Sequence, residues 1–304
     1  MKSKEGFVKS FDGEKIFYSV KGEGLPMVCC NGVGVSRFFW KYITEYFTKW
    51  GASVITWDYR GHGKSPIPKD LSNFSMETNA KDIKAILDEL GIEKAILIGH
   101  SMGVQVILEF WHLFPERTLG LIPILGTYEH PANTFFDWKG SLYVFKAAKY
   151  LVERNPEIPT RVWRWIMSKK FSYHFARLFI IHPTLCSYED MKPYFEHLVS
   201  LDLRVFFKMA DAMQRHSARS YLRKINCPVL IIAGEKDVFT PLWLSLKMHK
   251  LIPNSEILIL KQGSHAGLVE QPDLINYRIE KFIIEHFPEY IKRERRTEEK
   301  EVSN

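Results

Sequence analysis

Gly99-His100-Ser101-Met102-Gly103 fits the pattern G-x-S-x-G and lies between an apolar run, Ala95 to Ile98, and a stretch with helical spacing. A serine hydroxyl is a weak nucleophile unless a tight turn holds it exposed beside a base. A strand-to-helix turn does this and leaves room only for glycine on either side. The pentapeptide therefore predicts a nucleophile elbow with Ser101 as the nucleophile, shaped by Gly99, His100 and Gly103.

Working outward, short apolar runs of the kind that form buried strands recur along the chain. They are Met27 to Cys30, Val54 to Trp57, Ala95 to Ile98, Leu121 to Leu125, Val229 to Ala233 and Ile257 to Leu260. Phe7 to Lys9 and Ile16 to Val20, joined through Asp12-Gly13, predict an opening hairpin. Helical patterns lie between the runs, most clearly over Met76 to Leu90 with Gly91 as the C-terminal cap. This alternation predicts an α/β protein with a mostly parallel, doubly wound sheet and an N-terminal antiparallel hairpin.

The alternation fails once, between Tyr128 and Arg223, where the pattern is helical and aromatic and no comparable strand run occurs. This segment is expected to be an insertion on a regular α/β core. The predicted division is a core formed by residues 1–127 and 224–287, an inserted helical cap at 128–223, and a charged C-terminal tail at 288–304.

A nucleophilic serine needs a base and a group that orients the base. Asp237 and His265 each follow one of the last two apolar runs, and the order Ser101, Asp237, His265 is the one expected with this type of elbow. His265 would take the proton from Ser101 and return it to the leaving group, while Asp237 would hold the imidazole tautomer. Glu235 and Glu129 are the alternative acids.

Further motifs make the chain resemble the α/β-hydrolase fold superfamily over about residues 5 to 287. Asp58-Tyr59-Arg60-Gly61-His62-Gly63-Lys64-Ser65 is similar to the family's D-x-R-G-x-G-x-S loop, and Gly263-Ser264-His265 is followed by Glu270-Gln271-Pro272. The resemblance implies that the insertion is a lid, or cap domain, lying over the active site. Arg60 and His62 are expected to shape their loop rather than to act on substrate. These motifs are specific for the fold and only weakly specific for the substrate.

Asn31-Gly32-Val33-Gly34 stands where many members of the family carry His-Gly. A backbone amide at this point completes the family's oxyanion hole, so the resemblance assigns the second donor to Val33. The first donor is Met102, because the elbow points its amide and the helix N-terminus at the developing oxyanion. A backbone donor tolerates the change to Asn31, whose side chain is expected to hydrogen-bond within its own loop.

The nature of the nucleophile selects among activities of this family. Haloalkane dehalogenases and epoxide hydrolases resemble the architecture but use a carboxylate, and Ser101 argues against both. The expected activity is hydrolysis of a carboxylic ester with an apolar acyl or aromatic part, through an acyl-serine intermediate. A carbon–carbon bond hydrolase, a thioesterase, an amidase or aminopeptidase, a perhydrolase and a polyhydroxyalkanoate depolymerase are alternatives on the same triad. A non-catalytic ligand-binding receptor of this fold is a hypothesis of another class.

The composition, 46% hydrophobic and 25% charged, excludes a disordered, collagen-like or disulfide-scaffold chain. The cap holds 15 Lys and Arg against 9 Asp and Glu, most of the chain's net charge of +7, and 19 of its 42 aromatic residues. One interpretation is an apolar pocket with a basic face toward an anionic substrate or lipid surface. The other is a cap with an aromatic core and a solvated basic face.

Several classes of partner and location are not expected. Met1 to Glu14 has lysines but no apolar run after them, so no secretory signal is predicted and the protein is expected to be cytoplasmic. Ala95 to Phe114 contains polar residues and is expected to be a buried strand and helix rather than a membrane span. The tail at 292–301 alternates in sign, which argues against nucleic acid binding. Peripheral membrane contact through the basic cap stays open.

Metal and cofactor binding are not expected either. The four cysteines are Cys29, Cys30, Cys186 and Cys227, and they have neither the spacing of a zinc site nor that of a disulfide framework. The sequence also lacks a P-loop and a G-x-G-x-x-G element. The predicted substrate is a small, apolar, ester-like molecule, and the sequence indicates no oligomeric state.

Overall fold

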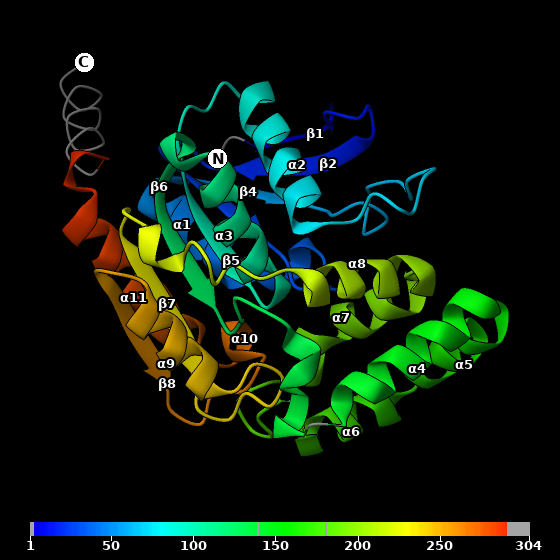
Figure 1. Cartoon of the computed structure of the whole chain (residues 1–304). Coiled ribbons are helices and arrows are strands. Elements are labelled where there is room, and N and C mark those ends of the chain that lie inside the picture. The colour runs from blue at the N-terminus through cyan, green and yellow to red at the C-terminus, as the bar shows by residue number, and fades with distance from the viewer. Residues whose placement is uncertain (1–2, 139, 180, 291–304) are drawn as a thin grey trace.

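The computed structural model describes residues 3–138, 140–179 and 181–290 (Figure 1). Among these residues eight strands form one sheet in the order β1-β2-β4-β3-β5-β6-β7-β8. The strands are β1 (Ser3–Lys9), β2 (Lys15–Lys21), β3 (Leu25–Cys30), β4 (Ala52–Trp57), β5 (Ala95–His100), β6 (Thr118–Ile124), β7 (Val229–Gly234) and β8 (Ser255–Leu260). The pairs β1/β2 and β2/β4 are antiparallel and the others parallel. The predicted α/β-hydrolase fold, with its mostly parallel sheet and N-terminal hairpin, is confirmed.

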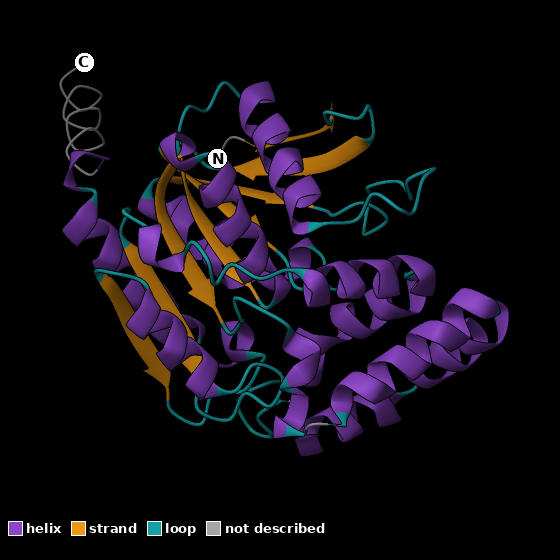
Figure 2. Cartoon of the chain, viewed as in Figure 1, coloured by secondary structure: helices purple, strands orange, loops and turns teal. Residues whose placement is uncertain are grey.

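Helices cover both faces of this sheet (Figure 2). The helices of the core are α1 (Lys41–Trp50), α2 (Met76–Glu89), α3 (Met102–Leu113), α9 (Leu242–Leu251), α10 (Gly267–Glu270) and α11 (Pro272–His286). Side chains of α2 and α3 pack on one face, and those of α1 and α11 on the other. Leu97 of β5 belongs to the first core and Ile96 and Ile98 to the second. Because both faces are covered, the central strands are apolar at successive positions.

The ends of α2 show how local sequence sets these elements. The Ser75 side chain accepts a hydrogen bond from the Thr78 amide at 2.9 Å and caps the N-terminus of α2. Just beyond the C-terminus, Gly91 has a φ of +64°, a left-handed conformation that glycine adopts without steric cost. The predicted helix and its glycine cap are confirmed.

The segment between β6 and β7 is helical. Its α-helices are α4 (Ser141–Arg154), α5 (Glu157–Met167), α6 (Lys170–Phe179), α7 (Tyr188–Ser200) and α8 (Leu203–Arg215). It also contains the short 3-10 helices η3 (Pro131–Asn133), η4 (Phe135–Asp137) and η5 (Leu222–Lys224). Two further 3-10 helices, η1 (Arg37–Trp40) and η2 (Pro115–Arg117), lie before this segment. The two ends of the segment meet, since the Ala218 amide donates to the Tyr128 carbonyl at 2.9 Å. Figure 1 shows α4 and α5 at the outer edge, away from the sheet. Residues 128–223 are called the cap segment below.

None of the helices in the described ranges has the length and apolar character needed to cross a membrane. The apolar stretch from Ala95 forms β5 and α3, as predicted. Of the predicted tail at 288–304, residues 291–304 lie outside the described residues.

Candidate active site

Ser101 occupies the turn between β5 and α3. Its φ of 56° and ψ of −116° form a conformation that L-residues other than glycine rarely adopt. A Cβ at Gly99 would lie 2.3 Å from the Gly103 carbonyl oxygen, and a Cβ at Gly103 would lie 2.1 Å from the Cys30 carbonyl oxygen. The turn therefore requires glycine at both positions, as the sequence pattern predicted, and it directs Ser101 into a cavity.

The structure brings Ser101, His265 and Asp237 together. The Nε2 atom of His265 lies 2.9 Å from the Ser101 Oγ atom. The Nδ1 atom of the same ring lies 2.8 Å from the Asp237 Oδ2 atom. Because a carboxylate accepts hydrogen bonds, Nδ1 carries the ring proton and Nε2 faces the serine hydroxyl as an acceptor. This geometry fits a nucleophile, a base and an orienting acid.

Asp237 is fixed by the residues that follow it. Its side chain is fully buried. Its Oδ1 atom accepts from the amides of Phe239 and Thr240, both at 2.9 Å, and its Oδ2 atom also accepts from the Thr240 hydroxyl at 2.7 Å. These bonds fix the orientation of the carboxylate and aim it at His265. Thr240 was missed by the sequence analysis, although an Asp followed three residues later by Thr is a signal for such a turn.

The alternative acids point elsewhere. Glu235 accepts from the Gln262 amide at 3.0 Å. Glu129 forms an ion pair with Arg219 at 3.2 Å. Of the three carboxylates considered, only Asp237 contacts the His265 ring.

The His100 side chain contacts the backbone and the ring of His265. Its Nε2–H donates to the His265 carbonyl at 3.0 Å, and the two rings pack with centroids 5.0 Å apart. Burial, together with the neighbouring His265, lowers the pKa of His100 to about 3. His100 is therefore neutral at physiological pH, so that one ring nitrogen donates and the other carries no proton.

Glu270, which the sequence analysis quoted without a role, anchors the loop that carries His265. Its buried carboxylate accepts from the Ser264 amide at 2.9 Å, and the Ser264 hydroxyl in turn accepts from the Ala266 amide at 3.1 Å. The other oxygen of Glu270 accepts from the His182 amide of the cap segment at 2.6 Å. One carboxylate thus ties the cap backbone to the histidine loop.

The two expected oxyanion donors lie on segments that are close to Ser101. Met102 is the first residue of α3, so its amide has no acceptor within the helix. The loop with Val33 passes close to the serine, since a Cβ at Gly32 would lie 3.1 Å from the Ser101 Cβ atom, and Val33 lines the cavity. This arrangement is compatible with both assignments, which stay predictions.

Asn31 differs from expectation. Its side-chain amide donates to the Trp57 carbonyl of β4 at 2.8 Å, and its Oδ1 atom accepts from the Trp40 indole at 2.6 Å. The prediction of a bond within its own loop is wrong, because the neighbouring strand and η1 bring better-placed partners to this buried side chain. Asn31 thus anchors the start of the loop that carries Val33.

Arg60 and His62 shape their loop, as expected. The Arg60 guanidinium is buried and binds Asp82 at 2.6 and 2.8 Å and Asp12 at 3.1 Å. His62 lies within 3.1 Å of the Arg60 carbonyl through Nδ1, and its Nε2 atom accepts from the Gly34 amide at 3.4 Å. Burial lowers the pKa of His62 to about 4. Neither side chain has a hydrogen bond to the Ser101 or Asp237 side chain in the described part of the chain.

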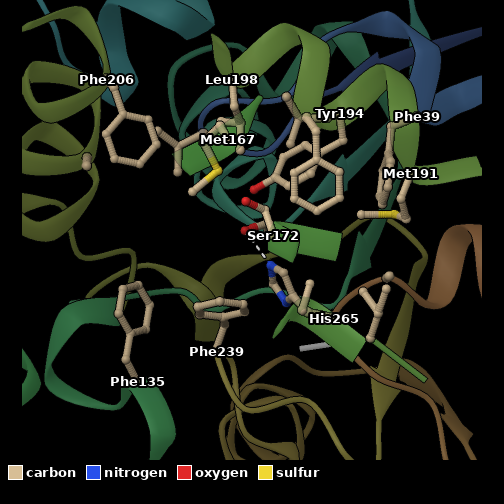
Figure 3. A pocket seen from close by; sticks show the side chains of 18 of the residues that line it. Phe39, Phe135, Met167, Ser172, Met191, Tyr194, Leu198, Phe206, Phe239 and His265 are labelled. Atoms are coloured by element: carbon tan, nitrogen blue, oxygen red, sulfur yellow. Dashed lines mark hydrogen bonds between the residues drawn. The ribbon is translucent and has the colours of Figure 1, made fainter. Parts of the chain in front are cut away.

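A cavity of about 570 Å³ lies over Ser101 and His265 (Figure 3). The core contributes residues such as Phe39 and Phe239, and the cap segment contributes Met167, Leu198 and Phe206. No Asp, Glu, Lys or Arg is among the described residues that line it. The site is therefore suited to a neutral, apolar ligand with one polar group near Ser101.

Over the described ranges, no cluster of three or more His, Cys, Asp and Glu side chains has the arrangement that would hold a metal ion. The four cysteines are free, and all except the half-buried Cys227 are buried.

Comparisons with known proteins agree with the architecture. A family profile described as alpha/beta hydrolase fold matches residues 26–157, and one described as TAP-like protein matches residues 207–286. Bifunctional epoxide hydrolase 2 of Mus musculus is 22% identical over 306 residues, covering 91% of this chain, which spans only 55% of that relative's length. Putative carbamate hydrolase RutD of Azorhizobium caulinodans is 23% identical over 266 residues, which cover 86% of this chain and 92% of that relative.

Among solved structures, an esterase (EaEST) from Exiguobacterium antarcticum superposes with a TM-score of 0.74 at 21% identity. The superposition covers 92% of this chain and 99% of the esterase. At this level of identity the likeness concerns the fold.

Proposed function

Because the chain is a member of the α/β-hydrolase fold superfamily, we propose that it is a serine hydrolase that cleaves carboxylic esters with an apolar acyl or aromatic part. The observation that carries this proposal is the hydrogen-bonded series from Ser101 through His265 to Asp237 at the floor of a cavity without charged side chains. A neutral ester matches both its polar floor and its apolar walls.

The geometry supports a two-step reaction. The Nε2 atom of His265 takes the proton of Ser101 as the hydroxyl oxygen attacks the ester carbonyl carbon. The amides of Val33 and Met102 stabilise the oxyanion, and His265 then returns the proton to the departing alcohol, leaving an acyl-serine. Water, deprotonated by the same histidine, attacks the acyl carbon. The bond from this carbon to the Ser101 Oγ atom then breaks, His265 returns the proton to Oγ, and the acid product leaves.

The type of nucleophile favours this activity over the one that the mouse relative's name states. Opening an epoxide through an alkyl-enzyme ester uses a carboxylate nucleophile, and this chain has Ser101 at that turn. A serine held beside a histidine suits acyl transfer instead. Thioesters, amides, diketones and polyhydroxyalkanoates also react through an acyl-serine and are the alternative substrates.

The test is hydrolysis of a p-nitrophenyl ester chain-length series by the full chain. Ser101→Ala should lower kcat by about 10⁶-fold, and Asp237→Asn, which disturbs the tautomer of His265, by about 10⁴-fold. Glu235→Gln is the matched control, because it changes a carboxylate in the same loop that does not contact His265, and it should leave kcat unchanged. A fluorophosphonate probe should label Ser101.

Undiminished ester hydrolysis by Ser101→Ala would overturn the proposal. Faster turnover of a thioester or a β-diketone than of any ester would reassign the substrate. Tight small-molecule binding that survives Ser101→Ala, with negligible turnover of every substrate by the unmodified chain, would identify a ligand-binding protein instead.

A further inference from the structure

Apolar side chains gather on the solvent side of three consecutive cap helices. Nine of the 21 large apolar side chains that are exposed in the described residues lie on α4, α5 and α6. They are Tyr143, Val144, Tyr150, Leu151, Ile158, Val162, Trp165, Phe171 and Phe175. We call these nine residues the outer cap surface. A contiguous exposed apolar patch of this kind is more often an interaction site than an ordinary part of the solvent-exposed surface.

The same three helices carry the cap's positive charge. Residues 141–179 contain eight Lys and Arg but only two acids, Glu153 and Glu157, whereas the rest of the cap segment has seven of each sign. Seven of the eight basic side chains have no ion-pair partner among the described residues. Six of these seven are exposed: Lys146, Arg154, Arg161, Arg164, Lys169 and Lys170. The whole excess charge of the cap therefore accompanies the outer cap surface.

Helix α5 has two apolar sides. Trp163, Ile166 and Met167 line the cavity. Ile158, Val162 and Trp165, spaced at i, i+4 and i+7, are 51 to 65% exposed. A helix that buries one apolar side in its own protein gains nothing in water from a second, unless that second side also has an apolar environment to enter.

The cavity reaches this surface at α6. Phe171 and Phe175 both line the cavity, and they are 62% and 50% exposed. Their rings lie 6.3 Å apart. The apolar lining of the cavity is thus continuous with the outer cap surface.

We propose that the outer cap surface docks on an anionic phospholipid bilayer, and that the cavity takes its apolar substrate from that bilayer. Aromatic and aliphatic side chains would enter the headgroup and acyl boundary, while the lysines and arginines would remain at the level of the lipid phosphates. The positive charge selects an anionic surface. A second copy of the chain is a poor occupant, because two surfaces of the same sign would repel. The statement about substrate delivery rests on the proposed function, whereas the docking does not.

The experiment is flotation of the full chain with vesicles of phosphatidylcholine alone or mixed in equal parts with phosphatidylglycerol. The unmodified chain should bind the mixed vesicles and dissociate from them at high salt, because salt screens the attraction between its basic side chains and the anionic lipid. Combining Ile158→Ala, Val162→Ala and Trp165→Ala should weaken binding by more than about tenfold. Arg161→Gln and Arg164→Gln should each weaken binding to the mixed vesicles by about fivefold.

Matched controls lie on α11, where Tyr277 and Ile284 are 64% and 47% exposed. Combining Tyr277→Ala and Ile284→Ala should leave vesicle binding unchanged. All these variants should hydrolyse a water-soluble short ester at the rate of the unmodified chain, which shows that they fold. A long-chain ester embedded in mixed vesicles should be hydrolysed more slowly by the α5 triple variant and, to a smaller extent, by the two arginine variants, but at the unmodified rate by the α11 variant.

Failure of the unmodified chain to bind mixed vesicles would overturn the docking, as would equal losses for the α11 and α5 variants. A concentration-dependent dimer that the α5 triple variant abolishes would also overturn it and identify a self-association surface. Ser101→Ala should still bind vesicles. Vesicle binding by a chain that hydrolyses no ester would defeat the proposed function while supporting the docking.

Discussion

The two walls of the cavity are built on different principles. On the core wall, backbone and side-chain hydrogen bonds fix Asp237, His265 and the turn of Ser101. On the cap wall, apolar side chains fill space, and Phe171 and Phe175 also reach the surface. Hydrogen bonds are directional and allow little displacement, whereas apolar contacts tolerate repacking. The core wall is thus suited to chemistry, and the cap wall to choice of substrate.

The largest expected difference concerns two glycines. A Cβ at Gly103 would lie 2.1 Å from the Cys30 carbonyl oxygen, and a Cβ at Gly140 would lie 2.2 Å from the Trp138 ring. The Cys30 backbone next to Gly103 cannot move without disrupting the turn that holds Ser101. The Trp138 side chain next to Gly140 is 57% exposed and can rotate into solvent. Gly103→Ala should therefore lower the free energy of unfolding by about 3 kcal/mol, and Gly140→Ala by less than about 0.5 kcal/mol, in urea titrations. Equal losses would show that the cap is as rigid as the core.

A smaller effect is expected from pH. Burial lowers the pKa of His62 to about 4, so the folded chain leaves His62 neutral where the unfolded chain binds a proton at about pH 6.5. The unfolded state then holds more protons, and stability falls as the pH drops through this window. From pH 6.5 to 5 the loss attributable to His62 should be about 2 kcal/mol.

Urea titrations at several pH values separate this contribution. His62→Gln should show a shallower dependence on pH, and it should keep the part due to His100, whose pKa is lowered to about 3 by burial. His174→Gln changes an exposed histidine of the cap and should follow the unmodified chain. A His62→Gln curve parallel to that of the unmodified chain would contradict the assignment.

The smallest expected effect is on substrate selectivity, and it tests whether the cap wall contacts the distal part of the substrate. Phe135 lines the cavity, while its neighbour Phe136 does not and is 51% exposed. Figure 3 shows Phe135 well away from His265, where the distal part of a long acyl chain would lie. Phe135→Ala should lower kcat/KM for a long-chain ester by about tenfold and leave that for an acetyl ester unchanged. Phe136→Ala should alter neither, and an equal loss on both esters would point to a disturbed core wall.

Much of the core could be predicted because its signals are local. Buried strands give continuous apolar runs, and the elbow requires glycine at Gly99 and Gly103 for steric reasons within a few residues. The strand runs, the hairpin and the α2 helix all lie where the patterns placed them. The proximity of Asp237 and His265 to Ser101 followed from a shared sheet edge, because parallel strands end on the same side.

Contacts between distant segments could not be predicted. Asn31 bonds to Trp57 and Trp40, and Glu270 bonds to Ser264 and also to His182, which lies 88 positions before Glu270 in the sequence. No local pattern encodes which of several polar groups will be nearest after folding. Composition placed aromatic residues and positive charge in the cap, but it did not indicate which side chains face the cavity and which face solvent.

The conformation of Ser101 has an evolutionary consequence. A residue other than glycine at φ 56° and ψ −116° costs about 1 to 3 kcal/mol, which glycine would avoid. Selection for a stable fold alone would therefore favour glycine at position 101. In a descendant under no selection for the Ser101 hydroxyl, we expect glycine to appear at position 101. This change would raise the free energy of unfolding and remove the proposed nucleophile.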